Sequence, residues 1–212
     1  MLTYNKILTM IKNDKKFCYS RFGDGDFLCM LGHGGKNRDK HNYFPDLGKR
    51  LVDIIYSKPE YYVGTRTMRS TEKVKGQKFD AIKSQIKWED SEIFVTASIN
   101  NDLQKFFNAM KTKKVLYVAN GYLLKLDKFE FKKIPVGQIN CWLEYEKTKK
   151  ELSGQIRSVD IVLYSACMMS KVLIDDFKHI DVTQIDMGSV FDPYVGICSR
   201  GYHSALMKSW EK

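Results

Sequence analysis

Asp24 and Asp26, two carboxylates with a single glycine between them, form the pattern in this sequence with the clearest chemical potential. Gly25 lets the backbone bend and adds no side-chain bulk, so both carboxylates can turn toward one point. Such a pair suits a hard divalent cation, because Mg²⁺ or Mn²⁺ is commonly held by one or two carboxylates together with water and substrate phosphate oxygens. Arg21 could add a bidentate contact to the same phosphate. Asp24 and Asp26 are therefore candidate metal ligands, and Arg21 is a candidate phosphate ligand.

A purely structural interpretation of these residues is also open. Strand-favouring residues precede the motif and apolar residues follow it, which is typical of a strand-to-helix turn. In such a turn Asp24 could simply cap the helix, while Gly23 and Gly25 form the turn. Better-known motifs do not match: an EF-hand loop would need an oxygen ligand where Leu28 stands, and the chain contains no phosphate-binding P-loop.

Three further candidate residues stand at or after the carboxyl ends of predicted strands. In open α/β sheets, ligands bind beyond these ends. Arg66 comes directly after one strand and could bind phosphate or sugar, or could be an exposed loop arginine. Asp186 and Asp192 come at and after the end of the last strand, and either could act as a general base. Alternatively, Asp186 could hold backbone amides of the turn and Asp192 could be only a turn former. The polar segment 200–203 could fold back over the same site.

The run Ser20-Arg21-Phe22-Gly23-Asp24-Gly25-Asp26 resembles the Arg-Phe-Gly-Asp-Gly-Glu signature of the GT-D-fold glycosyltransferases, a family of bacterial and phage enzymes first described as a domain of unknown function. Segments 64–66, 170–177 and 184–192 resemble other parts of that family. Its signature carboxylates form a metal motif for a nucleotide-sugar donor, so the resemblance implies that Asp24 and Asp26 hold the metal beside the donor-binding glycines Gly23 and Gly25. Asp26 stands where the family usually has Glu, and Ser189 stands where it has His.

The resemblance implies a metal-dependent glycosyltransferase that takes a sugar from a nucleotide diphosphate donor, a UDP-sugar, and transfers it with inversion. Mn²⁺ or Mg²⁺, together with Arg21 and Arg66, would stabilise the negative charge on the departing diphosphate. Asp192 is the first choice for the general base and Asp186 the second. The acceptor could be a glycan, a protein side chain or a modified base in DNA. The competing hypothesis is a non-catalytic basic protein that binds nucleotides or nucleic acid, and it rests on charge alone.

The elements that would position these residues follow from the hydrophobic pattern. It predicts helices over residues 3–13, 45–56, 79–86, 103–110 and 142–152, and strands over 17–19, 61–65, 93–97, 115–119, 129–134, 159–164 and 182–186. Asn140 is predicted to cap the helix that follows it. The glycine-rich, basic segment 32–42 is predicted to be a mobile loop that could close over the donor. Strands that alternate with helices in this way predict an α/β fold: a Rossmann-like, doubly wound, mostly parallel sheet with helices on both faces.

Composition sets wider limits. A chain of 212 residues with 43% hydrophobic residues predicts a single globular domain over residues 1–212. The five cysteines are odd in number and lack metal-site spacing, so we expect reduced thiols. No run is long and apolar enough for a membrane span, and the first residues lack a signal-peptide pattern, which leads us to expect a cytoplasmic protein. The net charge of +10 could attract polyanions or simply reflect a lysine-rich surface.

Overall fold

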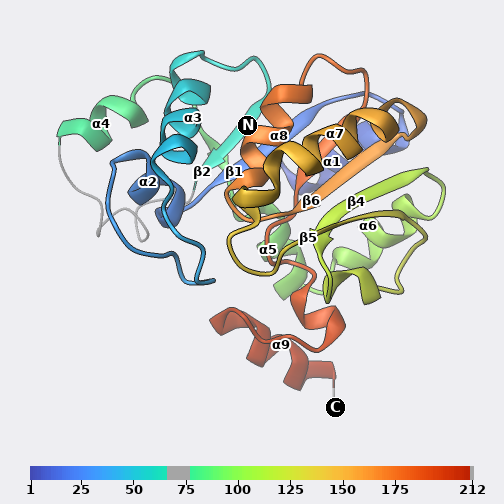
Figure 1. Ribbon diagram of the computed structural model, residues 1–212. Coiled ribbons are helices and arrows are strands. Elements are labelled where there is room, and N and C mark those ends of the chain that lie inside the picture. The colour runs from blue at the N-terminus through green and yellow to red at the C-terminus, as the bar shows by residue number, and fades with distance from the viewer. Residues whose placement is uncertain (66–76, 211–212) are drawn as a thin grey trace.

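The strands of this protein form one parallel sheet with helices on both faces (Figure 1). The computed structural model describes residues 1–65 and 77–210. All pairings between neighbouring strands are parallel, which confirms the predicted doubly wound α/β fold. The strands lie in the order β3 (Glu89–Asp90), β2 (Tyr62–Thr65), β1 (Cys18–Phe22), β7 (Thr183–Asp186), β6 (Ile161–Ser165), β4 (Val115–Asn120) and β5 (Lys132–Val136).

Two layers of helices cover the sheet. One face carries α1 (Tyr4–Lys12), α5 (Ile93–Ile99) and α6 (Leu103–Met110), and the other carries α2 (Asp24–Met30), α3 (Pro45–Tyr56), α7 (Tyr145–Gln155) and α8 (Met169–Phe177). Helix α4 (Gln77–Lys83) contacts α3, and α9 (Gly201–Trp210) lies below the sheet beside the C-terminus (Figure 1). Short 3₁₀ turns, η2 (Leu123–Lys125), η3 (Cys141–Glu144), η4 (Ile156–Ser158) and η5 (Asp192–Val195), join these elements.

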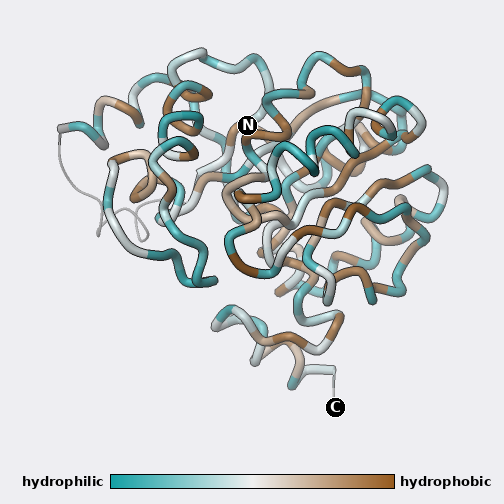
Figure 2. The backbone as a smooth tube through the Cα atoms, in the orientation of Figure 1, coloured by the Kyte–Doolittle hydropathy of each residue, from teal (hydrophilic) through white to brown (hydrophobic). Residues whose placement is uncertain are grey.

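The alternation of side chains along the strands separates two cores. Tyr19 and Tyr117 pack with α1, α5 and α6, whereas Leu116 and Val118 pack with α7 and α8. Both sets are buried because each strand lies between helices, so the central strands are hydrophobic on both faces. Figure 2 shows this as apolar strands inside more polar outer helices. Because alternate residues of a strand point to the same face, Arg21 lies on the same face of β1 as Tyr19.

Several predicted elements are confirmed and others are wrong. Helices α1, α3 and α6 match their predicted ranges within one residue at each end, and Thr3 caps α1 through a hydrogen bond from Lys6 N. The predicted strand 93–97 is instead helix α5. Its sequence favours a strand by propensity, but five of its seven residues are buried, and a continuous apolar run does not distinguish a buried strand from a buried helix. The strand that precedes it is the short edge strand β3.

Two further predictions differ in their details. The strand predicted over 129–134 begins at Lys132 as β5. Asn140 makes no capping hydrogen bond; it has a left-handed backbone with φ of 56°, and its side-chain oxygen accepts from Asn42 N at 2.8 Å. Asn is among the residues that tolerate this conformation. The helix after it starts as the 3₁₀ turn η3 and becomes α-helical at Tyr145.

Two predictions from composition can be compared with the structure. All five cysteines have free thiols, as expected. Within residues 1–65 and 77–210, no helix is both long and apolar enough to cross a bilayer.

Gly48 gives a stability prediction, because it lets α3 pack directly on α2. A Cβ atom at this position would lie 2.4 Å from the carbonyl oxygen of Cys29, a backbone atom that cannot move without shifting the helix. We expect Gly48→Ala to reduce the free energy of unfolding by about 1–3 kcal/mol, measured by urea denaturation. Gly154→Ala in α7 is the matched control, since a Cβ there meets no atom within 4 Å. Its helix should keep or gain stability, and equal stability of the two variants would contradict the prediction.

Candidate active site

A cavity of about 710 Å³ opens where β1 and β7 lie side by side, beyond the carboxyl ends of the strands. In open α/β sheets ligands bind beyond the carboxyl ends of the strands, and the volume suits a small-molecule site. The predicted site residues within the described ranges all line this one cavity: Arg21, Gly23, Asp24, Gly25, Asp26, Asp186 and Asp192. Arg66 lies outside the described residues.

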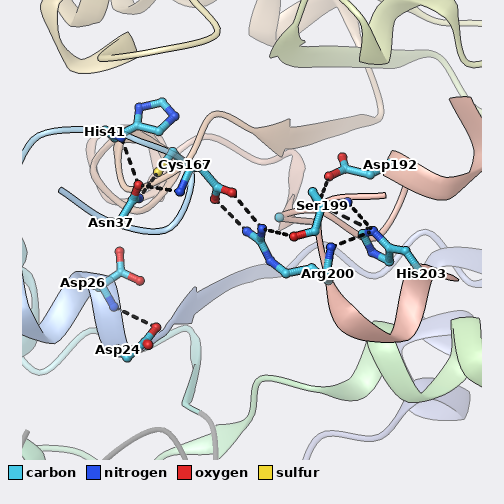
Figure 3. A network of polar contacts seen from close by, with 12 residues as sticks. Asp24, Asp26, Asn37, His41, Cys167, Asp192, Ser199, Arg200 and His203 are labelled. Atoms are coloured by element: carbon cyan, nitrogen blue, oxygen red, sulfur yellow. Dashed lines mark hydrogen bonds and ion pairs between the residues drawn. The ribbon is translucent and has the colours of Figure 1, made fainter. Parts of the chain in front are cut away.

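Asp24 and Asp26 belong to the first turn of α2 and have different environments. Gly23 is the N-cap residue, and Asp26 Oδ2 accepts a hydrogen bond from Gly23 N at 2.7 Å, so the capping carboxylate is Asp26 and not Asp24. Asp24 is exposed, and its Oδ1 accepts from Gly25 N at 2.9 Å (Figure 3). Gly25 leaves little room for a side chain, because a Cβ there would lie 3.1 Å from Asn37 Cβ of the 32–42 loop.

Lys171 of α8, which sequence reasoning did not single out, lies between two buried carboxylates. Its Nζ is 3.5 Å from Asp26 Oδ1 and 3.1 Å from Asp186 Oδ2, and it donates to the carbonyl oxygen of Cys167 at 3.2 Å. Burial opposes the charge of the lysine, but Asp186 and Asp26 together outweigh it and raise the lysine pKa, whereas burial raises the pKa of Asp26. A buried lysine inside a helix has no distinctive sequence signal, so only the fold reveals this contact.

The two predicted metal ligands do not fit a divalent cation equally well. Asp24 presents an exposed carboxylate to the cavity. In Asp26, one oxygen is held by a backbone amide and the other faces the Lys171 ammonium. No group of three or more His, Cys, Asp or Glu side chains suited to a metal occurs within residues 1–65 and 77–210. The residues present therefore fit a cation that Asp24 shares with ligand oxygens, as is common for Mg²⁺.

Arg21 lines the cavity and also ties its walls together. Its Nε donates to Ser91 O at 2.7 Å, and one terminal nitrogen donates to Met187 O at 2.9 Å. The other terminal nitrogen lies 3.9 Å from Glu92. Gly188 makes room for the guanidinium, because its φ is +56° and a Cβ there would lie 2.7 Å from Arg21. The arginine therefore joins the ends of β3 and β7, and its predicted phosphate contact would add to that role.

The two candidate bases differ in what their oxygens contact. Asp186 Oδ1 accepts from Gly188 N at 3.0 Å and Oδ2 faces Lys171, so this carboxylate holds a turn amide and a cation. Asp192 is buried at the start of η5, where Tyr122 and Ser199 donate hydrogen bonds to it. Burial raises the pKa of Asp192 to about 6, although the Ser199 hydrogen bond opposes the shift. A buried carboxylate with a pKa near neutrality suits a general base.

The predicted return of the C-terminal segment over the site is confirmed. Arg200 pairs with Asp39 of the 32–42 loop through two hydrogen bonds of 2.7 and 2.6 Å, and Tyr202 also lines the cavity. His203 Nδ1 accepts from the backbone amides of Ser199 and Arg200 (Figure 3). Burial and the neighbouring arginine lower the pKa of His203 to about 4, so its ring is neutral. Ser199 Oγ lies 3.5 Å from Nδ1, but its hydroxyl donates to Asp192 and Nδ1 accepts from the two amides, which argues against a nucleophile and base pair.

Comparison with known proteins adds evidence on the fold. No protein-family model matches the chain, and no curated protein matches its sequence significantly. Two structures of domain of unknown function 1792 (DUF1792), one selenomethionine-substituted and one described as a distinct glycosyltransferase fold, match 91% of this chain and 79% of theirs, with TM-scores of 0.70 at 18% identity. A structure described as a new glycosyltransferase (DUF1792) from Streptococcus sanguinis matches with a TM-score of 0.72 at 16% identity, over 91% of this chain and 82% of that one. The chain therefore has the DUF1792 fold, as its signature predicted.

Proposed function

We propose that this protein is a glycosyltransferase that transfers a sugar from a nucleotide diphosphate donor, a UDP-sugar, to an acceptor hydroxyl with inversion. The observation that carries the proposal is the convergence of the signature residues on one cavity beyond the carboxyl ends of the sheet strands. The likeness to structures described as glycosyltransferases supports it. The acceptor stays open among a glycan, a protein side chain and a modified base in DNA.

The charge of the cavity supports a role for a divalent cation. Five cationic side chains and six carboxylates line it, so its lining is net negative at pH 7 although the whole chain carries +10. A diphosphate entering such a cavity needs an added positive charge. We propose that Mn²⁺ or Mg²⁺, held by Asp24 and by diphosphate oxygens, supplies this charge and stabilises the leaving group. Arg21, Gly23 and Gly25 would border the diphosphate.

The chain's own residues account for the remaining chemistry. In the transfer, the bond from the sugar C1 to the β-phosphate oxygen breaks while a bond from C1 to the acceptor oxygen forms. The acceptor loses its proton, and we assign this proton to Asp192. Inversion needs the base on the opposite face of the sugar from the leaving group. Asp192 lines the same cavity as Asp24 and Asp26 and is drawn apart from them in Figure 3.

Isothermal titration with UDP and several UDP-sugars, with and without Mn²⁺, tests the donor and the metal together. We expect wild-type protein to bind UDP more tightly in Mn²⁺, and Asp24→Ala to lose that gain because its cation ligand is gone. Asp53→Ala, an exposed carboxylate of α3 outside the cavity, is the matched control and should behave like wild type. Absence of UDP binding in every condition would contradict the proposed function.

A further inference from the structure

The Lys171 ammonium lies in a cage of three oxygens at the floor of the cavity. These are Asp26 Oδ1 at 3.5 Å, Asp186 Oδ2 at 3.1 Å and Cys167 O at 3.2 Å. The side chain of Lys171 is only 8% exposed, and those of Asp26 and Asp186 are 9% and 1% exposed. Within residues 1–65 and 77–210, no donor other than the Lys171 ammonium faces either of these two carboxylate oxygens. The Lys171 ammonium therefore supplies the positive charge that balances these two buried carboxylates.

The oxygens of the cage have the chemistry of a divalent-cation site. Carboxylate and carbonyl oxygens are the ligands that Mg²⁺, Mn²⁺ and Ca²⁺ prefer. Two buried carboxylates that are both ionised are strongly disfavoured without a counter-ion, so either a cation or protons must neutralise them. A divalent ion that approached Asp26 would meet the ammonium at the same oxygen and would be repelled by it. Lys171 and a metal thus exclude each other at Asp26.

We propose that Lys171 is an internal competitor of the metal: it occupies the cation position at Asp26 and keeps the affinity of the nucleotide-free protein for divalent ions low. The only carboxylate of the signature that is open to an ion is then the exposed Asp24, which needs the diphosphate to complete the coordination. The ion and the donor therefore bind as a pair. The second part, pairing with the donor, rests on the proposed function, whereas competition at the cage does not.

The test is Mn²⁺ binding to nucleotide-free protein, followed by the electron paramagnetic resonance signal of free Mn²⁺. We expect weak binding by wild type and at least tenfold tighter binding by Lys171→Met, in which the three oxygens of the cage become available. Lys171→Met with Asp186→Asn removes one carboxylate of the cage and should lose that gain. Lys149→Met is the matched control, because Lys149 forms a 3.1 Å ion pair with Asp176 outside the cavity.

Folding is measured beside binding, by circular dichroism and thermal melting in EDTA and in Mn²⁺. If Lys171→Met is unfolded in EDTA, Mn²⁺ should refold it, since an ion that binds only the folded state stabilises that state. A folded Lys171→Met that binds Mn²⁺ no more tightly than wild type would overturn the inference. So would a variant that stays unfolded in Mn²⁺.

Adding UDP separates this inference from the proposed function. In wild type, UDP should raise the affinity for Mn²⁺ at least tenfold, and Mn²⁺ should raise the affinity for UDP by the same factor. Failure of UDP to bind would contradict the proposed function and leave the gain of Mn²⁺ affinity in Lys171→Met intact. Tight Mn²⁺ binding by wild type without UDP would overturn the inference while the donor assignment stood.

Discussion

Asp192→Asn is expected to lower the rate of sugar transfer by about 10²- to 10⁴-fold, the usual contribution of a positioned general base. Asparagine has almost the same shape, and its one side-chain oxygen can still accept one of the two hydrogen bonds that Ser199 and Tyr122 donate to separate oxygens of Asp192. Its amide nitrogen can donate to the other hydroxyl. It cannot take a proton from the acceptor. The donor should bind as before, so the loss should appear in kcat and not in the affinity for UDP measured by titration.

The pH profile identifies this carboxylate more specifically than the loss of rate does. Because burial raises the pKa of Asp192 to about 6, the base is protonated and inactive in more acidic solution. In wild type, kcat/KM should therefore rise with pH through about 6 and then level off, and this acidic limb should be missing in Asp192→Asn. Release of UDP from a UDP-sugar, with water as the acceptor, provides the assay while the natural acceptor is being sought.

Stability should change in the opposite direction from activity. The folded protein holds the Asp192 proton more tightly than the unfolded chain, so this carboxyl costs stability as the pH rises from about 4 to about 6. Asp192→Asn should consequently be at least as stable as wild type at pH 7, measured by thermal melting. Asp53→Asn is the control that should change neither property. Full activity in Asp192→Asn, with loss in Asp186→Asn, would transfer the role of base to Asp186.

The sequence was sufficient to predict the sheet and the place of the site, because both depend on local patterns. Strand-favouring residues before Gly23 and an apolar helix after it fix the turn that holds Asp24 and Asp26. The parallel sheet then brings this turn and Asp186 to the same edge. Helix α5 was mistaken for a strand because its burial comes from packing against Tyr4 and Phe106, contacts that depend on the tertiary fold.

The electrostatics of the site could not be predicted from spacing. Lys171 is 145 positions after Asp26 and meets it only because α8 packs against β1. The same holds for Asp39 and Arg200, which close one side of the cavity from distant parts of the chain. Sequence reasoning identified carboxylates by type, but whether each is exposed, paired or raised in pKa depends on neighbours that the fold supplies. Asp24 and Asp26, for example, share one predicted role as metal ligands, yet one is exposed and the other is buried against Lys171.

Replacing Arg21 should cause a large loss of stability at the site. Its side chain is 15% exposed, and its hydrogen bonds to Ser91 O and Met187 O join two strand ends across the cavity. Arg21→Met leaves both carbonyls without these donors and Glu92 without its 3.9 Å ion pair. Each lost partner of a buried polar group costs about 1–3 kcal/mol, so we expect a total loss of about 2–4 kcal/mol in urea denaturation.

Arg21→Lys distinguishes the structural role from the phosphate role that the sequence predicts. Lysine keeps the charge, but its single ammonium lacks the planar fork that reaches two carbonyls in fixed directions. If Arg21 acts only as a tie, Arg21→Lys should be destabilised while its folded fraction binds UDP like wild type. A phosphate contact predicts at least a tenfold loss of UDP affinity as well, since a bidentate contact to phosphate is replaced by a point charge.

Arg50→Ala is the matched control for the loss of stability. Arg50 pairs with Asp176 at 2.6 Å with 43% of its side chain exposed, and its removal should cost no more than about 1 kcal/mol. If Arg50→Ala lowers the free energy of unfolding as much as Arg21→Met does, the hydrogen bonds of Arg21 across the cavity do not stabilise the protein more than an exposed ion pair.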